Sequence, residues 1–281
     1  MKKMKLIFSG GLGNQMFQYA FYLSLKEKGL NVDIDLSLYS FIDMHNGYEL
    51  PSIFCIPNGT NDKSLNIKLR IIYLRILLKF KPKKIIYIDP FYFTNIPFNK
   101  NNYKFLFGYW QSEKYFENIR EIILRKFIFR SIDSQNIKLS DQIKSENSVS
   151  LHIRRGDYLN NSLYSDICTD EYYCSAINFM LNKLDNPVFY VFSNDIKWTK
   201  NYLKRFSIKH KIVTLNHGKK SYQDMFLMTN CKHNIIANSS FSWWGAWLND
   251  NKDKIVVAPK KWMNTEFEKY KNIVPDSWIK L

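Results

Sequence analysis

The sequence predicts an α/β fold in which strands and helices alternate around parallel sheets. Two observations carry this prediction. The chain opens with a strand, a glycine-rich turn and a helix, and after residue 145 short apolar runs alternate regularly with helical segments. A strand that continues through a helix into a parallel neighbour is the βαβ unit of such sheets. The change from irregular to regular alternation predicts two domains, 1–145 and 146–281.

The first part of the chain opens with a βαβ unit. A glycine-rich turn, GGLGNQ at 10–15, precedes the helix, and Gly29, with lysines just before it, ends that helix. The expected strand, helix and second strand cover residues 5–8, 16–29 and 31–35.

The stretch from residue 36 to residue 84 is harder to assign. Residues 36–66 are rich in turn formers and predict no regular element. Residues 67–80 have a helical pattern with basic residues on one side and lead into the basic stretch KPKK. Two interpretations stay open for 67–84: a helix that contacts an anionic membrane surface, or a core-facing helix with a solvated basic side.

The second part predicts a doubly wound α/β domain. Its expected strands are 149–153, 188–193, 212–215, 233–237 and 255–258. Its expected helices are 170–184, 197–206, 221–231 and a short one from Phe241.

The composition indicates an anionic partner. Lys and Arg number 41 against 25 Asp and Glu, and the net charge of +16 suits a nucleotide, phosphosugar, nucleic acid or anionic membrane. The four cysteines lack metal-ligand spacing, which predicts reduced thiols in a cytoplasmic protein. The apolar run near the start is too short for a signal peptide, and no run approaches the roughly 18 apolar residues of a membrane span.

The stretch SVSLHIRRGDYL, 148–159, places a polar cluster directly after a predicted strand. Ligands of open α/β sheets bind at the carboxyl ends of strands, and the arginine fork suits a phosphate. Successive side chains of an extended chain point to opposite faces, so we expect one of Arg154 and Arg155 to meet an anion and the other to pair with Asp157 and hold the loop. A surface ion-pair cluster is the alternative.

Two further stretches join a strand to a helix. In GGLGNQ the glycines allow close approach of a ligand to a helix start, but the motif lacks full dinucleotide or Walker spacing and also suits a structural turn. In ANSSF, 237–241, the serines either cap the next helix or offer hydroxyl and N–H groups to a phosphate. Part of the tryptophan group after them, Trp243, Trp244 and Trp247, is expected in the core.

Taken together, these motifs resemble one family. GGLGNQMFQYA, HIRRGDY, DMFLMTNCKHNIIANSSFSWWGAWLN and VVAPKKWM occur here in the order found in bacterial α-1,2-fucosyltransferases of glycosyltransferase family 11. The resemblance spans Gly10 to Met263, and it implies a GT-B fold in which two Rossmann-like domains face each other across a cleft. The acceptor would bind mainly to the first domain and GDP-fucose to the second.

The resemblance also implies a reaction and a set of residues. The reaction is an inverting transfer of L-fucose from GDP-β-L-fucose to the 2-hydroxyl of a galactoside in surface-glycan synthesis, without a metal or other cofactor. Arg154 would hold the β-phosphate, His152 and Asp224 would contact guanine, and Asn14 would approach the fucose. Lining the donor site would be Gly11, Gly13, Ser239, Ser240 and Phe241.

The general base stays open. Asp157 is the acid nearest the arginine motif, but an arginine that pins it would lower its pKa and make it a poor base. Asp166 is a second acid in the same loop, and the loop lacks a histidine that many relatives carry there.

Other functions compete with this prediction. Transfer to a different hydroxyl or to a protein acceptor would use the same arginine motif, and a non-catalytic sugar-binding relative is a weaker option. A nucleic-acid-binding protein would gather its bases and aromatics on one face, whereas here the bases are dispersed. A lipid-linked glycan acceptor would suit peripheral membrane contact through 67–84.

Overall fold

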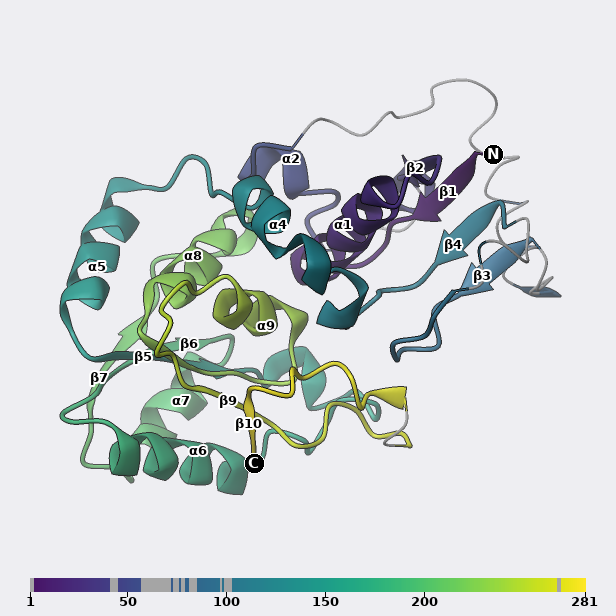
Figure 1. The fold of residues 1–281 in the computed structure, drawn as a ribbon. Coiled ribbons are helices and arrows are strands. Elements are labelled where there is room, and N and C mark those ends of the chain that lie inside the picture. The colour runs from purple at the N-terminus through teal and green to yellow at the C-terminus, as the bar shows by residue number, and fades with distance from the viewer. Residues whose placement is uncertain are drawn as a thin grey trace. The chain divides into compact units, whose positions relative to one another are not determined.

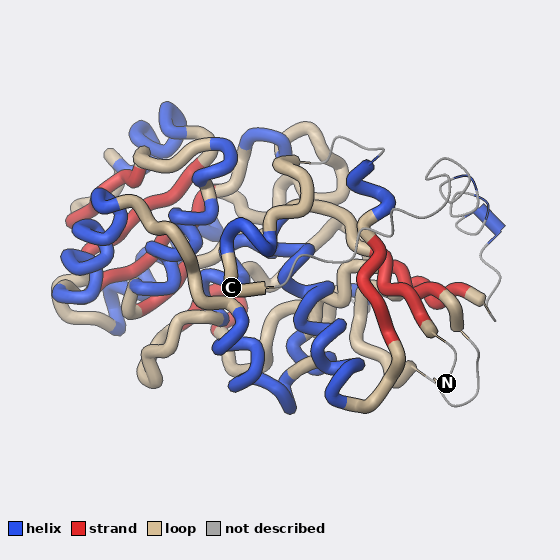
Figure 2. The backbone as a smooth tube through the Cα atoms, turned by 90° about the horizontal axis from the view of Figure 1, so that it is seen from above, coloured by secondary structure: helices blue, strands red, loops and turns tan. Residues whose placement is uncertain are grey.

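The computed structural model forms two compact units (Figures 1 and 2). The first contains Met1–Arg130 and Lys271–Ile273, and the second contains Ser131–Tyr270 and Val274–Leu281. The second unit therefore starts at Ser131, ahead of the expected boundary at 145. The structure describes residues 3–40, 45–56, 72, 76, 79–80, 85–96, 98, 103–266 and 269–281, without the side chains of Ser40 and Asp157.

The first unit is built on a four-stranded sheet in which every described pair is parallel. The strand order is β2-β1-β4-β3, and the expected βαβ opening is present. The strands are β1 (Met4–Ile7), β2 (Val32–Asp35), β3 (Ile86–Ile88) and β4 (Phe105–Phe107). The helices are α1 (Leu12–Glu27), α2 (Leu50–Ile53) and α4 (Arg120–Lys126), with short 3-10 turns η1 (Ser37–Ser40), η2 (Glu113–Tyr115) and η3 (Glu117–Ile119).

Aromatic packing anchors α1 in the first unit. Phe21 of α1 stacks on the fully buried Trp110, with ring centroids 4.2 Å apart. Tyr115 meets both rings edge-on. Buried aromatic pairs of this geometry stabilise a fold beyond the area they bury. The loop after β4 is thereby fixed against α1.

The second unit is built on a six-stranded sheet, again with parallel pairs, in the order β10-β9-β8-β5-β6-β7. Its strands are β5 (Ser148–Ile153), β6 (Val188–Ser193), β7 (Lys209–Val213), β8 (His233–Ile235), β9 (Val256–Ala258) and β10 (Ile279–Lys280). Its helices are α5 (Ser134–Ser145), α6 (Asp170–Lys183), α7 (Ile196–Leu203), α8 (Tyr222–Asn230) and α9 (Ser240–Trp247), with the 3-10 turns η4 (Gly156–Tyr158) and η5 (Gly218–Lys220).

Helices cover both faces of this second sheet (Figure 1). Val149, Leu151 and Ile153 of β5 pack into a cluster with α6 and α7, whereas α5 and α8 form a cluster with Tyr190 and Phe192 of β6. All six residues of β5 are buried. Its alternation therefore separates two buried faces, rather than a buried face from a solvated one. Its two serines find partners: the Lys232 N–H donates to the Ser148 hydroxyl over 3.1 Å, and Asn234 donates to the Ser150 hydroxyl over 2.7 Å.

The order of connections creates a switch point in the second sheet. From β5 the chain moves outward through β6 and β7, then returns to the other side of β5 with β8 and continues through β9. The α/β fold with parallel sheets, expected of a GT-B protein, is confirmed. In such sheets the ligand crevice lies at the carboxyl ends of the strands where the order reverses, here those of β5 and β8.

Several expected elements have different bounds. The strand expected at 212–215 is β7, which begins at Lys209, and α5 belongs to the second unit because Leu139 and Ile143 pack against α8. The 67–80 helix lies outside the described residues, apart from Ile72, Ile76, Lys79 and Phe80. None of the helices that the structure describes is long and apolar enough to cross a membrane.

Candidate active site

The switch point gathers three loops at one edge of the second sheet. β5 pairs with β6 on one side and with β8 on the other, so the residues that follow the three strands lie side by side. These residues are Arg154 and Arg155 after β5, Asn194 and Asp195 after β6, and Asn238 and Ser239 beyond β8.

Arg154 is positioned by two tyrosines. Its backbone N–H donates to the Tyr173 hydroxyl over 3.2 Å, and its guanidinium lies over the Tyr158 ring, 5.2 Å from the centroid. Stacking on an aromatic ring uses the face of a guanidinium, whereas phosphate recognition uses its edge. The side chain is half-buried, which strengthens its interaction with a bound anion.

Arg155 is held by groups that follow β6, and the expected pairing of an arginine with Asp157 stays a prediction. Its guanidinium lies 4.0 Å from the centroid of the Trp198 ring, its Nε is 3.8 Å from Asp195, and its N–H donates to Asn194 over 3.0 Å. Asn194 and Asp195 lie in the connection from β6 to α7 and Trp198 lies in α7, on the opposite face of β5 from His152. The side chain of Asp157 is not among those described, so its role as general base stays a prediction.

Gly156 allows this loop to approach the next strand. Its φ is +21°, and a Cβ there would lie 2.3 Å from the Asn194 amide nitrogen. A larger residue would push the loop away from β6 and displace both arginines.

His152 is a buried, neutral imidazole. Burial, and secondarily the charge of Arg154, lowers its pKa to about 3. Its ring centroid lies 6.1 Å from that of Phe241, and its Nδ1 has no hydrogen-bond partner among the described residues. A buried nitrogen of this kind gains most from a ligand that can hydrogen-bond to it.

The start of α9 argues against the interpretation that the Ser239 side chain caps the helix. Ser239 is the N-cap residue, with extended backbone, yet its side chain makes no capping hydrogen bond. Ser240 and Phe241 form the first turn and are half-buried. Behind them Trp243, Trp244 and Trp247 are buried, which confirms their place in the core.

Asp224 lies in the first turn of α8, at the same edge of the sheet, because α8 begins shortly after the carboxyl end of β7. Burial raises its pKa to about 7, although a hydrogen bond from Asn216 (2.7 Å) and the neighbouring His217 oppose the shift. Asn216 is held in turn by a reciprocal amide pair with Asn136 of α5. A half-buried carboxylate with one amide partner retains capacity for further donors.

The first unit has its own polar edge, around the glycine turn. Gly10 has φ +81°, and a Cβ there would lie 2.7 Å from the Asn14 amide. Gly11 is the N-cap of α1 with extended backbone, and Gly13 is buried in the first turn. Gln111, in the loop after β4, donates to the Asn14 oxygen over 2.7 Å. The Asn14 amide is thereby oriented with its NH2 away from Gln111.

Sequence reasoning missed the groups that hold this turn. Gln15 donates to Gly10 and Gly47, Gln18 donates to Gly108, and the Tyr39 hydroxyl donates to Gly10 over 2.7 Å. The sequence signal that could have found these groups is the pair Asn14 and Gln15 in GGLGNQ, because an uncharged amide in an otherwise apolar helix indicates a buried hydrogen-bonding role.

Asp89, which follows β3, is a second acid that the sequence did not single out. It is buried, and burial raises its pKa to about 6 while backbone N–H groups, from Trp110 above all, oppose the shift. The Trp110 N–H lies 2.8 Å from its Oδ2. Its oxygens serve the loop after β4.

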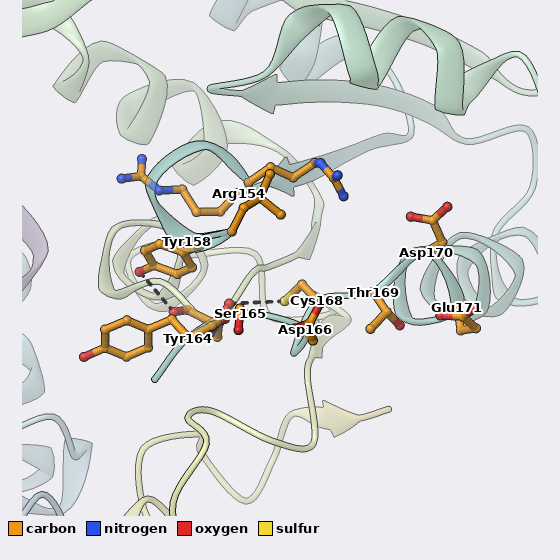
Figure 3. A pocket seen from close by; sticks show the side chains of 12 residues that line it. Arg154, Tyr158, Tyr164, Ser165, Asp166, Cys168, Thr169, Asp170 and Glu171 are labelled. Atoms are coloured by element: carbon orange, nitrogen blue, oxygen red, sulfur yellow. Dashed lines mark hydrogen bonds between the residues drawn. The ribbon is translucent and has the colours of Figure 1, made fainter. Parts of the chain in front are cut away.

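A polar pocket of about 270 Å³ opens beside Arg154 in the second unit (Figure 3). Its walls come from the loop after β5, the start of α6 and Asn238. Within the part of the chain that the structure describes, no three His, Cys, Asp or Glu side chains gather in a way that would hold a metal ion.

The chain belongs to glycosyl transferase family 11, whose model matches residues 3–281. Relatives support this assignment along the whole chain. The chain is 35% identical to an alpha-1,2-colitosyltransferase and 34% identical to the O-antigen biosynthesis glycosyltransferase WbnK, both of Escherichia coli. Each match covers 97% of this chain, with 97% and 98% of the two relatives.

More distant similarities agree with the fold. A galactoside alpha-(1,2)-fucosyltransferase 1 of mouse is 26% identical over 92% of this chain and 67% of its own length. A structure of mutant FUT1 from Arabidopsis thaliana in complex with GDP superposes with a TM-score of 0.52 at 10% identity, covering 92% of this chain and 70% of that one. The last likeness concerns the fold alone.

Proposed function

We propose that the chain is an inverting α-1,2-fucosyltransferase that moves L-fucose from GDP-β-L-fucose to the 2-hydroxyl of a galactoside, in surface-glycan synthesis. The observation that carries this proposal is the place of Arg154 in a family 11 chain. It lies at the switch point of the second sheet, next to the strand that leads into the start of α9. The fucosyl and O-antigen relatives support the donor and the pathway class.

The chemistry requires fixed positive charge at the leaving group. An attacking hydroxyl displaces GDP through an oxocarbenium-like state, so negative charge develops on the β-phosphate as the glycosidic bond breaks. In this proposal the Arg154 guanidinium and the N–H groups at the α9 start, near Ser239 and Ser240, meet that charge. This arrangement needs no metal, and we expect none.

The proposed guanine contacts follow from the protonation states. As a carboxylate, Asp224 accepts the paired N1–H and N2–H of guanine, a donor pair that adenine lacks. The neutral imidazole of His152 adds a hydrogen bond without a buried charge. Phe241 completes the diphosphate side of the site.

The first unit is proposed to bind the acceptor, with Asn14 directed at the fucose and the glycines 11 and 13 lining its approach. Asp157 is proposed as the base that removes the proton from the acceptor hydroxyl. If the acceptor is lipid-linked, the exposed Ile72, Ile76 and Phe80, four positions apart, are suited to an anionic lipid surface beside the lysines of 67–84.

A second donor is favoured by one comparison. The colitosyltransferase matches this chain along its length, and colitose is L-fucose without its 3-hydroxyl. The same arginine and guanine contacts would serve a GDP-linked colitose.

The test is a donor and acceptor panel. The purified chain is incubated with GDP-fucose or GDP-colitose and a set of galactosides, and the product linkage is determined. We expect an α-1,2 linkage to galactose. Transfer to another hydroxyl or to a protein would support the alternative fucosyltransferases, and no transfer from either donor would overturn the proposal.

A further inference from the structure

The pocket beside Arg154 has a mixed electrostatic character that one substrate part would match. Arg154 and Arg155 both line it, and Asp166, Asp170 and the exposed Glu171 contribute carboxylates. Figure 3 shows Tyr158 and Tyr164 at one end of the pocket and Asp170 at the other. A simple anion would meet the acids, and a simple cation would meet the arginines. A ligand with an anionic end and a hydroxyl-rich end satisfies both.

The size of the pocket restricts that ligand. Its volume of about 270 Å³ is below the roughly 300–1,000 Å³ of pockets that hold drug-sized molecules. A single sugar ring suits this volume, and a nucleoside attached to a sugar does not.

An aromatic pair forms part of the wall. The rings of Tyr158 and Tyr164 are stacked, with centroids 5.2 Å apart and an interplanar angle of 24°. Rigid aromatic faces with a polar edge pack against the C–H face of a pyranose while the ring hydroxyls point elsewhere.

The carboxylates of Asp166 and Asp170 each have an oxygen that can accept a hydrogen bond from a hydroxyl group. One oxygen of Asp170 lies 3.4 Å from the Arg205 guanidinium, and the other has no recorded partner among the described residues. Asp166 is exposed, has a left-handed backbone (φ +56°), and likewise has no recorded partner in the described part of the chain. A carboxylate is an acceptor only, so it suits hydroxyl donors.

We infer that this pocket holds the pyranose ring of the donor, and that Asp166 and Asp170 accept hydrogen bonds from its hydroxyls. The inference rests on the proposed function. Arg154 holds the β-phosphate there, and the glycosidic bond places the sugar ring directly beside that phosphate. Asp166 and Asp170 would then be specificity-determining residues for the transferred sugar, distinct from the groups that bind guanine.

The test compares Asp166→Asn and Asp170→Asn with a matched control, Asp185→Asn, an exposed acid beyond the other end of α6. Each substitution keeps the side-chain size and replaces one acceptor oxygen by a donor amide. The measurements are GDP and GDP-fucose affinity by calorimetry, and separate kinetic constants for donor and acceptor. The melting temperature of each variant shows that it is folded.

We expect GDP affinity and the acceptor KM to stay within about twofold, and kcat/KM for GDP-fucose to fall about 10- to 100-fold in at least one pocket variant. The value of kcat/KM for GDP-colitose would fall less than that for GDP-fucose if the substituted carboxylate accepts a hydrogen bond from the 3-hydroxyl, which colitose lacks.

Three results would overturn the inference. If kcat/KM and affinity for GDP-fucose in the pocket variants equal those of the control, the donor sugar does not bind in this pocket. A change confined to the acceptor KM would assign the pocket to the acceptor ring, and weaker binding of GDP itself would assign it to the nucleotide. Failure of the proposed function is separate, because the wild-type chain would then transfer from neither GDP-sugar.

Discussion

The carboxyl edges of the two sheets share a scaffold and differ in chemistry. In each unit a central parallel strand ends in a turn to a helix whose N-cap residue, Gly11 or Ser239, makes no side-chain capping bond. In the second unit the groups beside that turn are arginines stacked on aromatic rings. In the first unit the turn is held by the neutral amides Gln15 and Gln18.

This difference shows that the helix start alone does not select the ligand. Both edges carry oriented N–H groups, but among the residues that the structure describes the second edge combines them with stacked arginines, and an anion needs such fixed cations in a partly buried site. Neutral amides suit the hydroxyls of a sugar, which can donate and accept. In the proposed function, the same βα connection would serve an anion-binding edge in one unit and a hydroxyl-binding edge in the other.

Asp89 in the first unit and Asp224 in the second also differ in the groups that their carboxylates accept. Asp89 and Asp224 both have raised pKa values, about 6 and about 7, because of burial. Asp89 accepts backbone N–H groups from Phe91 in its own loop and from Trp110 in the loop after β4, so its role is structural. Asp224 accepts one side-chain amide and keeps room for a ligand.

The largest expected effect comes from Arg154→Ala. Removing one fixed donor at a developing oxyanion typically lowers the rate about 100- to 1,000-fold, and we expect this loss in kcat with GDP-fucose. The control is Arg125→Ala, an exposed arginine of α4, with melting temperatures for both. Near-wild-type turnover without Arg154 would break the contrast between the two edges.

Asp224→Asn is expected to weaken GDP binding about 10- to 100-fold, because asparagine offers one acceptor oxygen instead of two. In the wild type, GDP affinity should fall as the pH drops through about 7, since a protonated Asp224 loses acceptor capacity. Calorimetry between pH 6 and pH 8 measures this, and a flat profile would contradict the guanine contact.

Ionisation of Asp224, which is expected to favour GDP binding, is expected to lower the stability of the fold. Its pKa is raised above the unfolded value, so the folded state binds the extra proton and the free energy of unfolding declines as the pH rises from about 4 to about 7. Asp224→Asn should therefore raise the melting temperature more at pH 8 than at pH 5. An equal shift at both values would argue against a buried, titrating carboxyl.

Asn14→Ala tests the role of the glycine turn in the first unit. We expect kcat to fall about 3- to 10-fold, the value of one neutral hydrogen bond, while GDP affinity stays unchanged because the first unit does not bind the nucleotide in this proposal. Asn201→Ala, in the exposed part of α7, is the control. A loss of GDP affinity in Asn14→Ala would place the glycine turn at the nucleotide.

The smallest expected effect is that of a chelator. With arginine and helix N–H groups meeting the leaving-group charge, we expect activity with EDTA to stay within about twofold of that without it. A strict requirement for a divalent cation, restored by Mg²⁺ or Mn²⁺ after chelation, would show that the anion-binding edge is incomplete without a metal.

Several parts of the fold and site could be predicted because their signals are local. The period-2 run of β5, the glycine turn before α1 and the tryptophans of α9 each follow from neighbouring residues. The polar residues at the end of β5 could be placed at a ligand-binding edge for the same reason. The predicted start of β7 was wrong and α5 was not predicted, since both elements depend on packing against distant parts of the chain.

What the sequence by itself determined is the alternation of parallel strands and helices and the position of Arg154 at a strand end. Only the tertiary structure decided that Arg155 lies against Asp195 and Trp198, and that Gln111 orients Asn14 from 97 positions away. Periodicity records which face of an element is buried, whereas burial-dependent pKa values and long-range hydrogen bonds depend on neighbours that only the folded chain brings together.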